Sequence, residues 1–157
     1  MKEKRETDMA VLAIVVDRKT GRIILIFDRS KPKPHWKFIV GGVKRKDFKR
    51  CPGDEESAAD AAAIREVRGE TGLVARIGHR LMRVTRHDGH RVHARVVVTE
   101  DMTNVVERGD SGEIPKAFSL EQIEGLIKNG AFLPHHLPFW KELLAYKSYL
   151  EVLFKER

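Results

Sequence analysis

The segment AAAIREVRGETGL, from Ala61 to Leu73, restricts the fold of this 157-residue chain more than any other. It belongs to an alanine-rich stretch, Glu55 to Thr71, made of good helix formers with acidic residues near its start, where the helix dipole favours them. Gly72 follows at a position where a left-handed residue would end the helix. Because side chains four positions apart share a helix face, Glu66 and Glu70 are expected to project together.

The Glu66–Glu70 pair has two interpretations. Two like charges at this spacing destabilise an isolated helix by roughly 0.2 to 0.5 kcal/mol, and one interpretation is a solvated acidic face with Arg65 and Arg68 nearby. The other is a cation site, because Mg²⁺ prefers carboxylate oxygens together with water and substrate phosphates. The spacing taken alone favours the solvated face.

Apolar runs before this helix predict strands. Met9 to Val16 is continuously apolar and is predicted to be a buried strand, and the turn RKTG joins it to a second apolar run, Arg22 to Ser30. A third strand, WKFIV, is expected to end at Gly41 and Gly42. The polar, basic segment 43–53 lacks helix or strand periodicity and is expected to be an exposed loop.

More strands and two helices are expected after the first helix. The dipeptide DG at 88–89 is a strong hairpin signal between two segments with strand character. Extended structure resumes around EIPKAFSL, and a capping box made by Ser119 and Gln122 opens a helix towards Gly130. A final helix is expected at about 138–155, with a proline in its first turn. This order predicts an α+β fold, an α/β/α sandwich with a mixed β-sheet.

The composition is consistent with a single folded domain, 1–157, that binds anionic partners. Hydrophobic residues make up 41% and charged residues 34%, which is ordinary for a globular protein. The net charge of +7 favours nucleotides, polyphosphates, RNA or acidic lipid as partners. The one cysteine, Cys51, cannot form an internal disulfide and fits a reducing cytoplasm. No run approaches the roughly 18 apolar residues of a membrane span, so no membrane segment is expected.

The residues around the glutamate pair resemble a known signature. REVRGETGL, Arg65 to Leu73, resembles the core of the Nudix box of the Nudix hydrolase family, Gx5Ex7REUxEExGU with U an aliphatic residue. Gly69 is a departure, because it stands where the family has the first glutamate of its EE pair. The other six specified positions match, namely Arg65, Glu66, Val67, Glu70, Gly72 and Leu73.

The upstream half of the box fits less well. Ser57 stands where the pattern has glutamate, although Glu56 is one residue earlier, and Cys51 stands where it has glycine. WKFIVGG resembles the family's usual approach to the box, so the glycines at 41 and 42 would serve across a longer loop. The box region is therefore predicted at 41–73, with the basic loop 43–53 as an insertion.

The resemblance implies a Nudix-like fold and hydrolysis of a nucleoside diphosphate derivative with Mg²⁺ or Mn²⁺. Glu66 and Glu70 would be metal ligands, and Glu66 would also help to orient the attacking water. Gly42 would offer its backbone carbonyl to the metal, and Arg65 would hold the glutamates. Glu113, in the loop before the last strand, is the first candidate for the general base. The other candidates in that loop are Glu107 and Asp110.

Basic and aromatic residues near the box are candidates for substrate binding. Lys44 and Arg45 open the run KRKDFKR, which would reach extra phosphates of a polyphosphate, a dinucleotide or an RNA 5′ end, or would be a solvated loop. Trp36 would stack a nucleobase or would pack in the core.

The histidines are weaker candidates. His87, His90 and His93 surround the predicted turn, but alternating side-chain directions along the strands argue against a shared metal site. His135 and His136 precede the final helix and are expected at the surface or as capping residues.

Two functions follow from the resemblance. The first is a Nudix-type pyrophosphohydrolase, supported by Glu66 and Glu70. The second is a degenerate Nudix domain that binds a nucleotide or RNA without turnover, supported by Gly69 and the disrupted upstream box. Gly69 predicts a site that binds fewer cations or binds them more weakly. The box does not distinguish the substrates of the family, and both a monomer and a homodimer fit the sequence.

Overall fold

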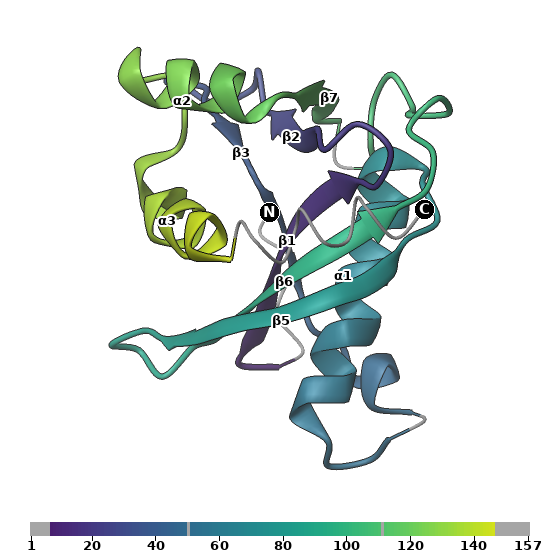
Figure 1. Ribbon diagram of the computed structural model, residues 1–157. Helices are drawn as coiled ribbons and strands as arrows, with labels where there is room; N and C mark the ends of the chain where they lie inside the picture. The colour runs from purple at the N-terminus through teal and green to yellow at the C-terminus, as the bar shows by residue number, and fades with distance from the viewer. Residues whose placement is uncertain (1–6, 50, 111, 147–157) are drawn as a thin grey trace.

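The computed structural model describes residues 7–49, 51–110 and 112–146. Within these residues a seven-stranded mixed sheet has α-helices packed against it (Figure 1). The strands are β1 (Met9–Asp17), β2 (Ile23–Phe27), β3 (Trp36–Lys37), β4 (Ile39–Gly42), β5 (Arg76–Thr85), β6 (Arg91–Thr99) and β7 (Ile114–Phe118). The helices are α1 (Glu55–Thr71), α2 (Leu120–Lys128) and α3 (Leu137–Ala145), with short 3₁₀ helices η1 (Arg45–Phe48) and η2 (Pro134–His136).

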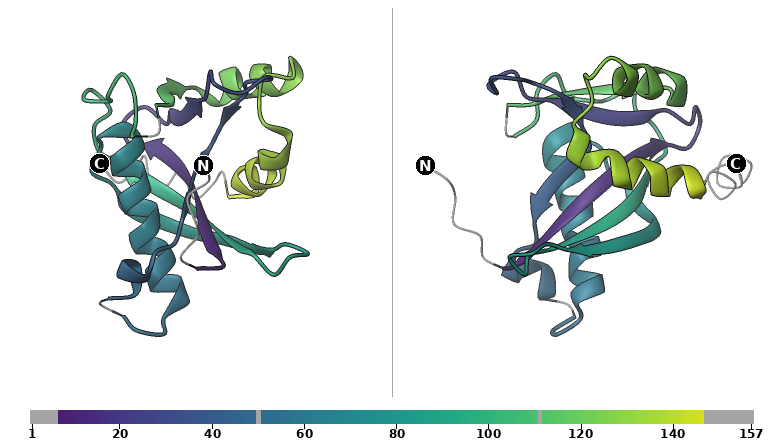
Figure 2. Two further views of the ribbon diagram at one scale, coloured as in Figure 1. Left: turned by 180° about the vertical axis from the view of Figure 1, so that it is seen from behind. Right: turned by 90° about the vertical axis from the view of Figure 1, so that its left-hand side faces the viewer.

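Strand β1 is the centre of the sheet. It runs parallel to β6 and antiparallel to β2 and β4. All nine of its residues are buried, because alternate side chains point to two faces that are both covered. Leu12, Ile14 and Val16 pack in a core with α2 and α3, whereas Val11 and Ala13 pack in a core with α1. Figure 2 shows α1 and α3 on opposite sides of the sheet. The expected α/β/α sandwich is confirmed.

Helix α1 begins and ends where the sequence predicts. The Asp54 carboxylate accepts a hydrogen bond from the backbone N–H of Ser57 at 3.1 Å, and Gly72 ends the helix with a φ of 77°. The face towards the sheet is rich in small side chains, which let the helix approach β1 and β4 closely. Its buried alanines are Ala58, Ala59, Ala62 and Ala63. This docking carries Glu66 towards β4 and Glu70 towards the segment before β7.

The predicted third strand is two strands in the structure. Strand β3 pairs with β2 and β4 pairs with β1, so the chain changes partner at Phe38. The backbone N–H of Phe38 donates to Nδ1 of His136 at 3.1 Å, and the two rings stack with centroids 5.8 Å apart. His136 is buried, so a surface position is wrong for it, but it does occupy the N-cap position of α3, without a side-chain capping hydrogen bond. Burial, assisted by the charge of Lys37, lowers the pKa of His136 to about 4.

The first part of the basic segment 43–53, residues 43–49, contains regular structure that its composition does not predict. Val43 is buried, and η1 follows it in place of an irregular loop. The backbone N–H of Lys44 donates to the Asp47 carboxylate at 2.7 Å, which closes the first turn of η1.

Two other predictions are confirmed. Strands β5 and β6 form the predicted hairpin, and Ser119 and Gln122 make the capping box of α2.

The final helix is described only in part. Helix α3 covers Leu137–Ala145, and the predicted continuation towards 155 lies outside the described residues beyond 146. Among the helices that are described, none has the length and apolar character needed to cross a membrane.

Candidate active site

Arg65 connects three parts of the candidate site. From α1 it donates to Oε1 of Glu66 at 2.8 Å, to the Gly42 carbonyl at 2.9 Å and to Oδ2 of Asp47 at 2.9 Å. A guanidinium can do this because it offers five donors in a rigid, planar fork. Arg65 therefore ties the end of β4, η1 and the Glu66 carboxylate together.

Glu66 lies against Gly41 at close range. A Cβ atom on Gly41 would lie 2.1 Å from Cδ of Glu66, so any side chain there would displace the carboxylate. Burial raises the pKa of Glu66 above its ordinary value; Arg65 opposes the rise, and the negative charge of Glu70 adds to it. Negative charge is thus crowded at this end of the helix face.

Glu70 is covered by the segment that precedes β7. Glu70 is buried, with only 4% of its surface exposed. A Cβ atom on Gly109 would lie 2.6 Å from Oε2 of Glu70, so only glycine allows the segment to come this close. The backbone N–H of Gly109 donates to the Glu113 carbonyl at 2.9 Å, which folds the segment into a loop over Glu70.

The strand register places Glu113 beside two other charged residues. Phe27 at the end of β2 pairs with Ile114 at the start of β7, so Glu113 and Asp28 extend from the same end of the two strands. Lys37 ends the neighbouring strand β3. Nζ of Lys37 lies 3.6 Å from Oε2 of Glu113.

The electrostatic surroundings of Glu113 favour its protonated form. Burial raises the pKa of Glu113 above its ordinary value, and the negative charges of Glu70 and Asp28 add to the rise. Lys37 opposes it. Glu113 is therefore within electrostatic range of Glu70, and its carboxylate can accept a proton more readily than an exposed glutamate.

Asp110 lies beside Gly69, the position where the box pattern is broken. A Cβ atom on Gly69 would be 2.7 Å from Oδ2 of Asp110, and the Asp110 N–H donates to the Gly69 carbonyl at 3.0 Å. A carboxylate from another segment thus lies next to the helix turn that lacks its own. Glu107, the remaining candidate in this segment, is exposed.

The other predicted residues lie around this group. The carbonyl of Gly42 accepts from Arg65, which leaves one of its two lone pairs for another partner. The charge of Lys44 lowers the pKa of Glu66, against the rise caused by burial, so Lys44 is close to the carboxylates. Arg45 is exposed on η1.

Trp36 packs against core rings. It is half-buried, and its ring centroid lies 4.9 Å from that of Phe27 and 4.8 Å from that of Phe118. Its place beside Lys37 on β3 keeps it near the end of the sheet where Glu113 lies.

A second acidic group lies at the start of α1, about 15 Å along the helix from the first by helical rise. Glu55, Glu56 and His93 of β6 place ligand atoms within 4.8 Å of one another. However, the two ring nitrogens of His93 face different carboxylates, at 3.2 Å for Glu56 and 3.8 Å for Glu55. Arg95 and Arg91 also bind these carboxylates, at 2.6 and 2.7 Å. Their positive charges disfavour a cation, so this group is better described as an ion-pair network.

Sequence reasoning missed Asp47, Lys37 and Gly109. Asp47 had a signal, because it is the one acidic residue in the run KRKDFKR. Lys37 and Gly109 had none. Their importance depends on what approaches them, and the Glu113 carboxylate and the Glu70 side chain come from distant parts of the chain.

Comparison with known proteins identifies the fold and the family. The solution structure of the E. coli ORF135 protein is similar to this chain with a TM-score of 0.61 and 20% identity, over 88% of this chain and 89% of that one. A NUDIX hydrolase from Nitrosomonas europaea is similar with a TM-score of 0.55 and 16% identity, over 90% of each chain. Identities this low show the fold alone. No curated protein matches the chain. The family model of the NUDIX domain matches residues 6–139, most of the chain, and the protein therefore belongs to the Nudix family.

Proposed function

We propose that the protein hydrolyses a pyrophosphate bond in a nucleoside diphosphate derivative, with Mg²⁺ or Mn²⁺ held by the box helix. Proteins with a Nudix domain typically hydrolyse nucleoside diphosphate derivatives. One observation carries the proposal for this chain: Glu66 and Glu70 project from α1, and Gly41 of β4 and Gly109 of the segment before β7 lie directly against their side chains.

The residues present fit a divalent cation. Carboxylates and a carbonyl are the hard oxygen ligands that Mg²⁺ and Mn²⁺ take, and Glu66, Glu70 and the free lone pair of Gly42 would supply them. Burial is the main cause of the raised pKa of Glu66, and the negative charge of Glu70 adds to it, so a cation bound there would favour the charged form of Glu66. Bound there, the metal would neutralise phosphate oxygens and lower the pKa of a water.

The residues of the chain then have separate tasks. An oxygen of the attacking water forms a bond to phosphorus, and the bridging P–O bond breaks, with its electron pair leaving on the departing phosphate. Glu113 accepts the proton of that water, for which its raised pKa suits it. Arg65 positions Glu66 and does not touch the substrate. Lys44, Arg45 and Trp36 remain the proposed contacts to the substrate.

A second candidate is binding without turnover. Gly69 supports it, because the helix turn beside Glu70 lacks one carboxylate of the family pattern. Asp110 lies next to that turn but on a different segment, so its carboxylate need not be held in the same place.

The deciding experiment is turnover of a panel of nucleoside diphosphate derivatives with Mg²⁺ or Mn²⁺. The natural protein, Glu70→Gln and the control Glu121→Gln, an exposed residue of α2, are compared. Turnover that Glu70→Gln abolishes and Glu121→Gln retains establishes the hydrolase and its site. No turnover across the panel, together with nucleotide binding that EDTA leaves intact, establishes the binding module instead.

We also propose that the chain acts in the cytoplasm as one domain over 1–157. Its substrate would be a small nucleotide derivative. The net charge of +7 and the exposed basic residues of η1, Arg45 and Lys46, support an RNA 5′ end as a larger partner. Whether it acts as a monomer or a homodimer stays a prediction that sedimentation would test.

A further inference from the structure

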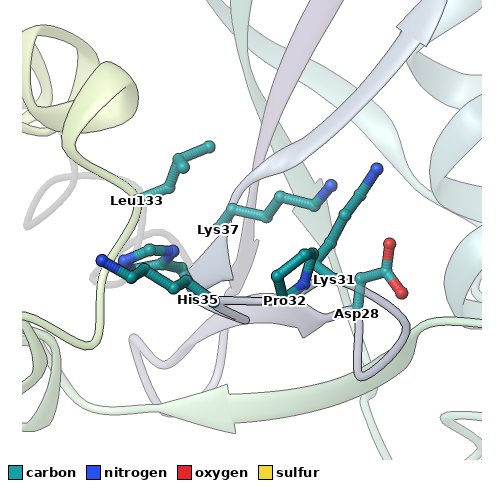
Figure 3. Close-up of a pocket in the computed structure, with 7 residues that line it drawn as sticks. Asp28, Lys31, Pro32, His35, Lys37 and Leu133 are labelled. Atoms are coloured by element: carbon teal, nitrogen blue, oxygen red, sulfur yellow. The ribbon is translucent and has the colours of Figure 1, made fainter.

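A cavity of about 570 Å³ opens beside β3, next to the proposed site (Figure 3). Its walls come from the β2–β3 connection, the end of β3 and the segment before η2. The lining residues are Asp28, Lys31, Pro32, Lys33, His35, Lys37 and Leu133. In Figure 3 the side chains of Lys31 and Lys37 extend in the same direction, and His35 lies towards the other end.

The cavity has an excess of positive charge. Three lysines line it, against the single carboxylate of Asp28. That carboxylate accepts hydrogen bonds from both the backbone N–H and the hydroxyl of Ser30, at 2.9 and 2.5 Å. Within the residues that the structure describes, Lys31 and Lys33 form no ion pair. Their ammonium groups are thus available to an anion from solution.

The cavity is connected to the proposed site through Lys37. This lysine lines the cavity and also lies 3.6 Å from the Glu113 carboxylate. The Glu113 carbonyl accepts the backbone N–H of Gly109 at 2.9 Å, and Gly109 lies directly against the Glu70 side chain. A molecule with one group at the carboxylates would therefore place its next group among these lysines.

The lining chemistry disfavours a nucleobase. No Phe, Tyr or Trp is among the described residues that line the cavity. Lysine ammonium groups, by contrast, neutralise phosphate oxygens with little demand on geometry.

We propose that this cavity binds phosphate groups of the substrate beyond the pyrophosphate that is cleaved. The substrate class is then a dinucleoside polyphosphate, which is still a nucleoside diphosphate derivative, rather than a nucleotide sugar. This inference rests on the proposed function for its reaction, but the anion site itself does not need turnover.

The first test measures binding of inorganic tripolyphosphate by calorimetry in EDTA. The variant Lys31→Gln/Lys33→Gln is compared with Lys116→Gln/Lys128→Gln, which removes the same charge from exposed lysines on β7 and α2. Loss of two exposed lysine–phosphate contacts is expected to weaken binding by roughly tenfold in the first variant and less than twofold in the second. Equal weakening in both variants, or no binding by the natural protein, overturns the proposal.

The second test separates this inference from the proposed hydrolysis. With Mn²⁺, Lys31→Gln/Lys33→Gln is expected to raise KM for diadenosine tetraphosphate several-fold with little change in kcat, and to leave a nucleotide sugar unaffected. Turnover that the two lysines do not influence overturns the inference and leaves the hydrolase standing. Lysine-dependent tripolyphosphate binding without turnover supports the cavity and overturns the hydrolase.

Discussion

Gly41 and Gly109 allow the two box glutamates to lie where they do. Each glycine faces a carboxylate at a distance that no Cβ atom would tolerate, Glu66 for Gly41 and Glu70 for Gly109. Gly69 differs from both, because what faces it is the end of a flexible, exposed side chain, Asp110. A side chain can be added at 69 if Asp110 moves aside.

We expect Gly69→Glu to raise the affinity for Mn²⁺ by about fivefold, because it restores a carboxylate beside Glu70, worth on the order of 1 kcal/mol. Electron paramagnetic resonance of free Mn²⁺ measures the affinity without turnover. In an Asp110→Gly background the gain should be larger, because the new side chain no longer displaces Asp110.

The control for this prediction is Gly69→Gln. Glutamine has nearly the same size as glutamate and a similar helix propensity, which is better than that of glycine by at most about 1 kcal/mol. It carries no charge. If Gly69→Glu and Gly69→Gln bind Mn²⁺ alike, the missing carboxylate is not what limits the metal site.

Lys37 is expected to set the acidic limb of the pH–rate profile. Burial raises the pKa of Glu113 above the ordinary glutamate value of 4.5, and Lys37 opposes the rise. Because a general base must be deprotonated, Glu113 acts only at pH values above its raised pKa. Lys37→Met removes the opposing charge and should move the acidic limb of kcat/KM to higher pH. Lys128→Met should leave the limb in place. A limb that does not move in Lys37→Met would show that Glu113 is not the base.

Helix α1 is anchored along its length by different kinds of contact. At its start Glu56 binds the buried Arg95 of β6 at 2.6 Å. In its middle Arg65 binds Asp47 of η1. At its end the backbone N–H of Val106 donates to the Thr71 carbonyl at 3.0 Å. These contacts orient the helix so that its acidic face meets β4 and the loop before β7.

The contact between η2 and the sheet predicts a pH dependence of stability. His136 accepts the Phe38 N–H only when neutral, and its pKa of about 4 is below the ordinary value of 6.5. Between these two pH values the unfolded chain binds the proton of His136 more tightly than the folded chain does. The contribution of neutral His136 to folding stability is therefore complete above pH 6.5 and is lost as pH falls towards 4. The expected loss between pH 7 and pH 5 is about 2 kcal/mol.

Urea unfolding at the two pH values measures this loss. His136→Gln keeps an acceptor for the Phe38 N–H but cannot titrate, so it should lose about 2 kcal/mol less than the natural protein. Other titrating groups, including His93 with its lowered pKa, are common to both proteins and cancel in the comparison. Equal losses in the two proteins would contradict the prediction.

The whole molecule combines a positive net charge with a local concentration of carboxylates. The net charge of +7 attracts anionic substrates over a range of about 8 Å at physiological ionic strength. The proposed site is locally acidic in spite of the positive net charge, because it contains Glu66, Glu70 and Glu113. The basic cavity beside β3 adjoins this acidic group. A negatively charged substrate and a divalent cation would therefore meet at the same end of the sheet.

Metal binding should stabilise the folded protein. At a Mn²⁺ concentration of 100 times Kd the gain is about 2.7 kcal/mol, which raises Tm by roughly 5 to 10 °C for a chain of this size. Glu70→Gln should lose most of the gain, and Glu121→Gln should keep it. A gain that is unchanged in Glu70→Gln would place the metal elsewhere, where Glu55, Glu56 and His93 offer an alternative group of ligand atoms.

Local chemistry made α1 predictable from the sequence. Its cap, its alanines and its glycine stop act over a few residues, and helix periodicity puts Glu66 and Glu70 on one face wherever the helix docks. The box resemblance and the order of elements then indicated the fold. The change of strand partner at Phe38 could not be predicted from WKFIV. The backbone N–H of Phe38 binds His136, which is 98 residues away in the chain.

By itself the sequence determined the fold class, the family and the pair of glutamates, because all three are written in short-range patterns. Only the tertiary structure decided that Gly109 covers Glu70, that Asp110 lies beside Gly69, and that Lys37 joins Glu113 to a basic cavity. The physical reason is that these contacts depend on strand register and on close packing between segments far apart in the chain, and residue type alone carries neither.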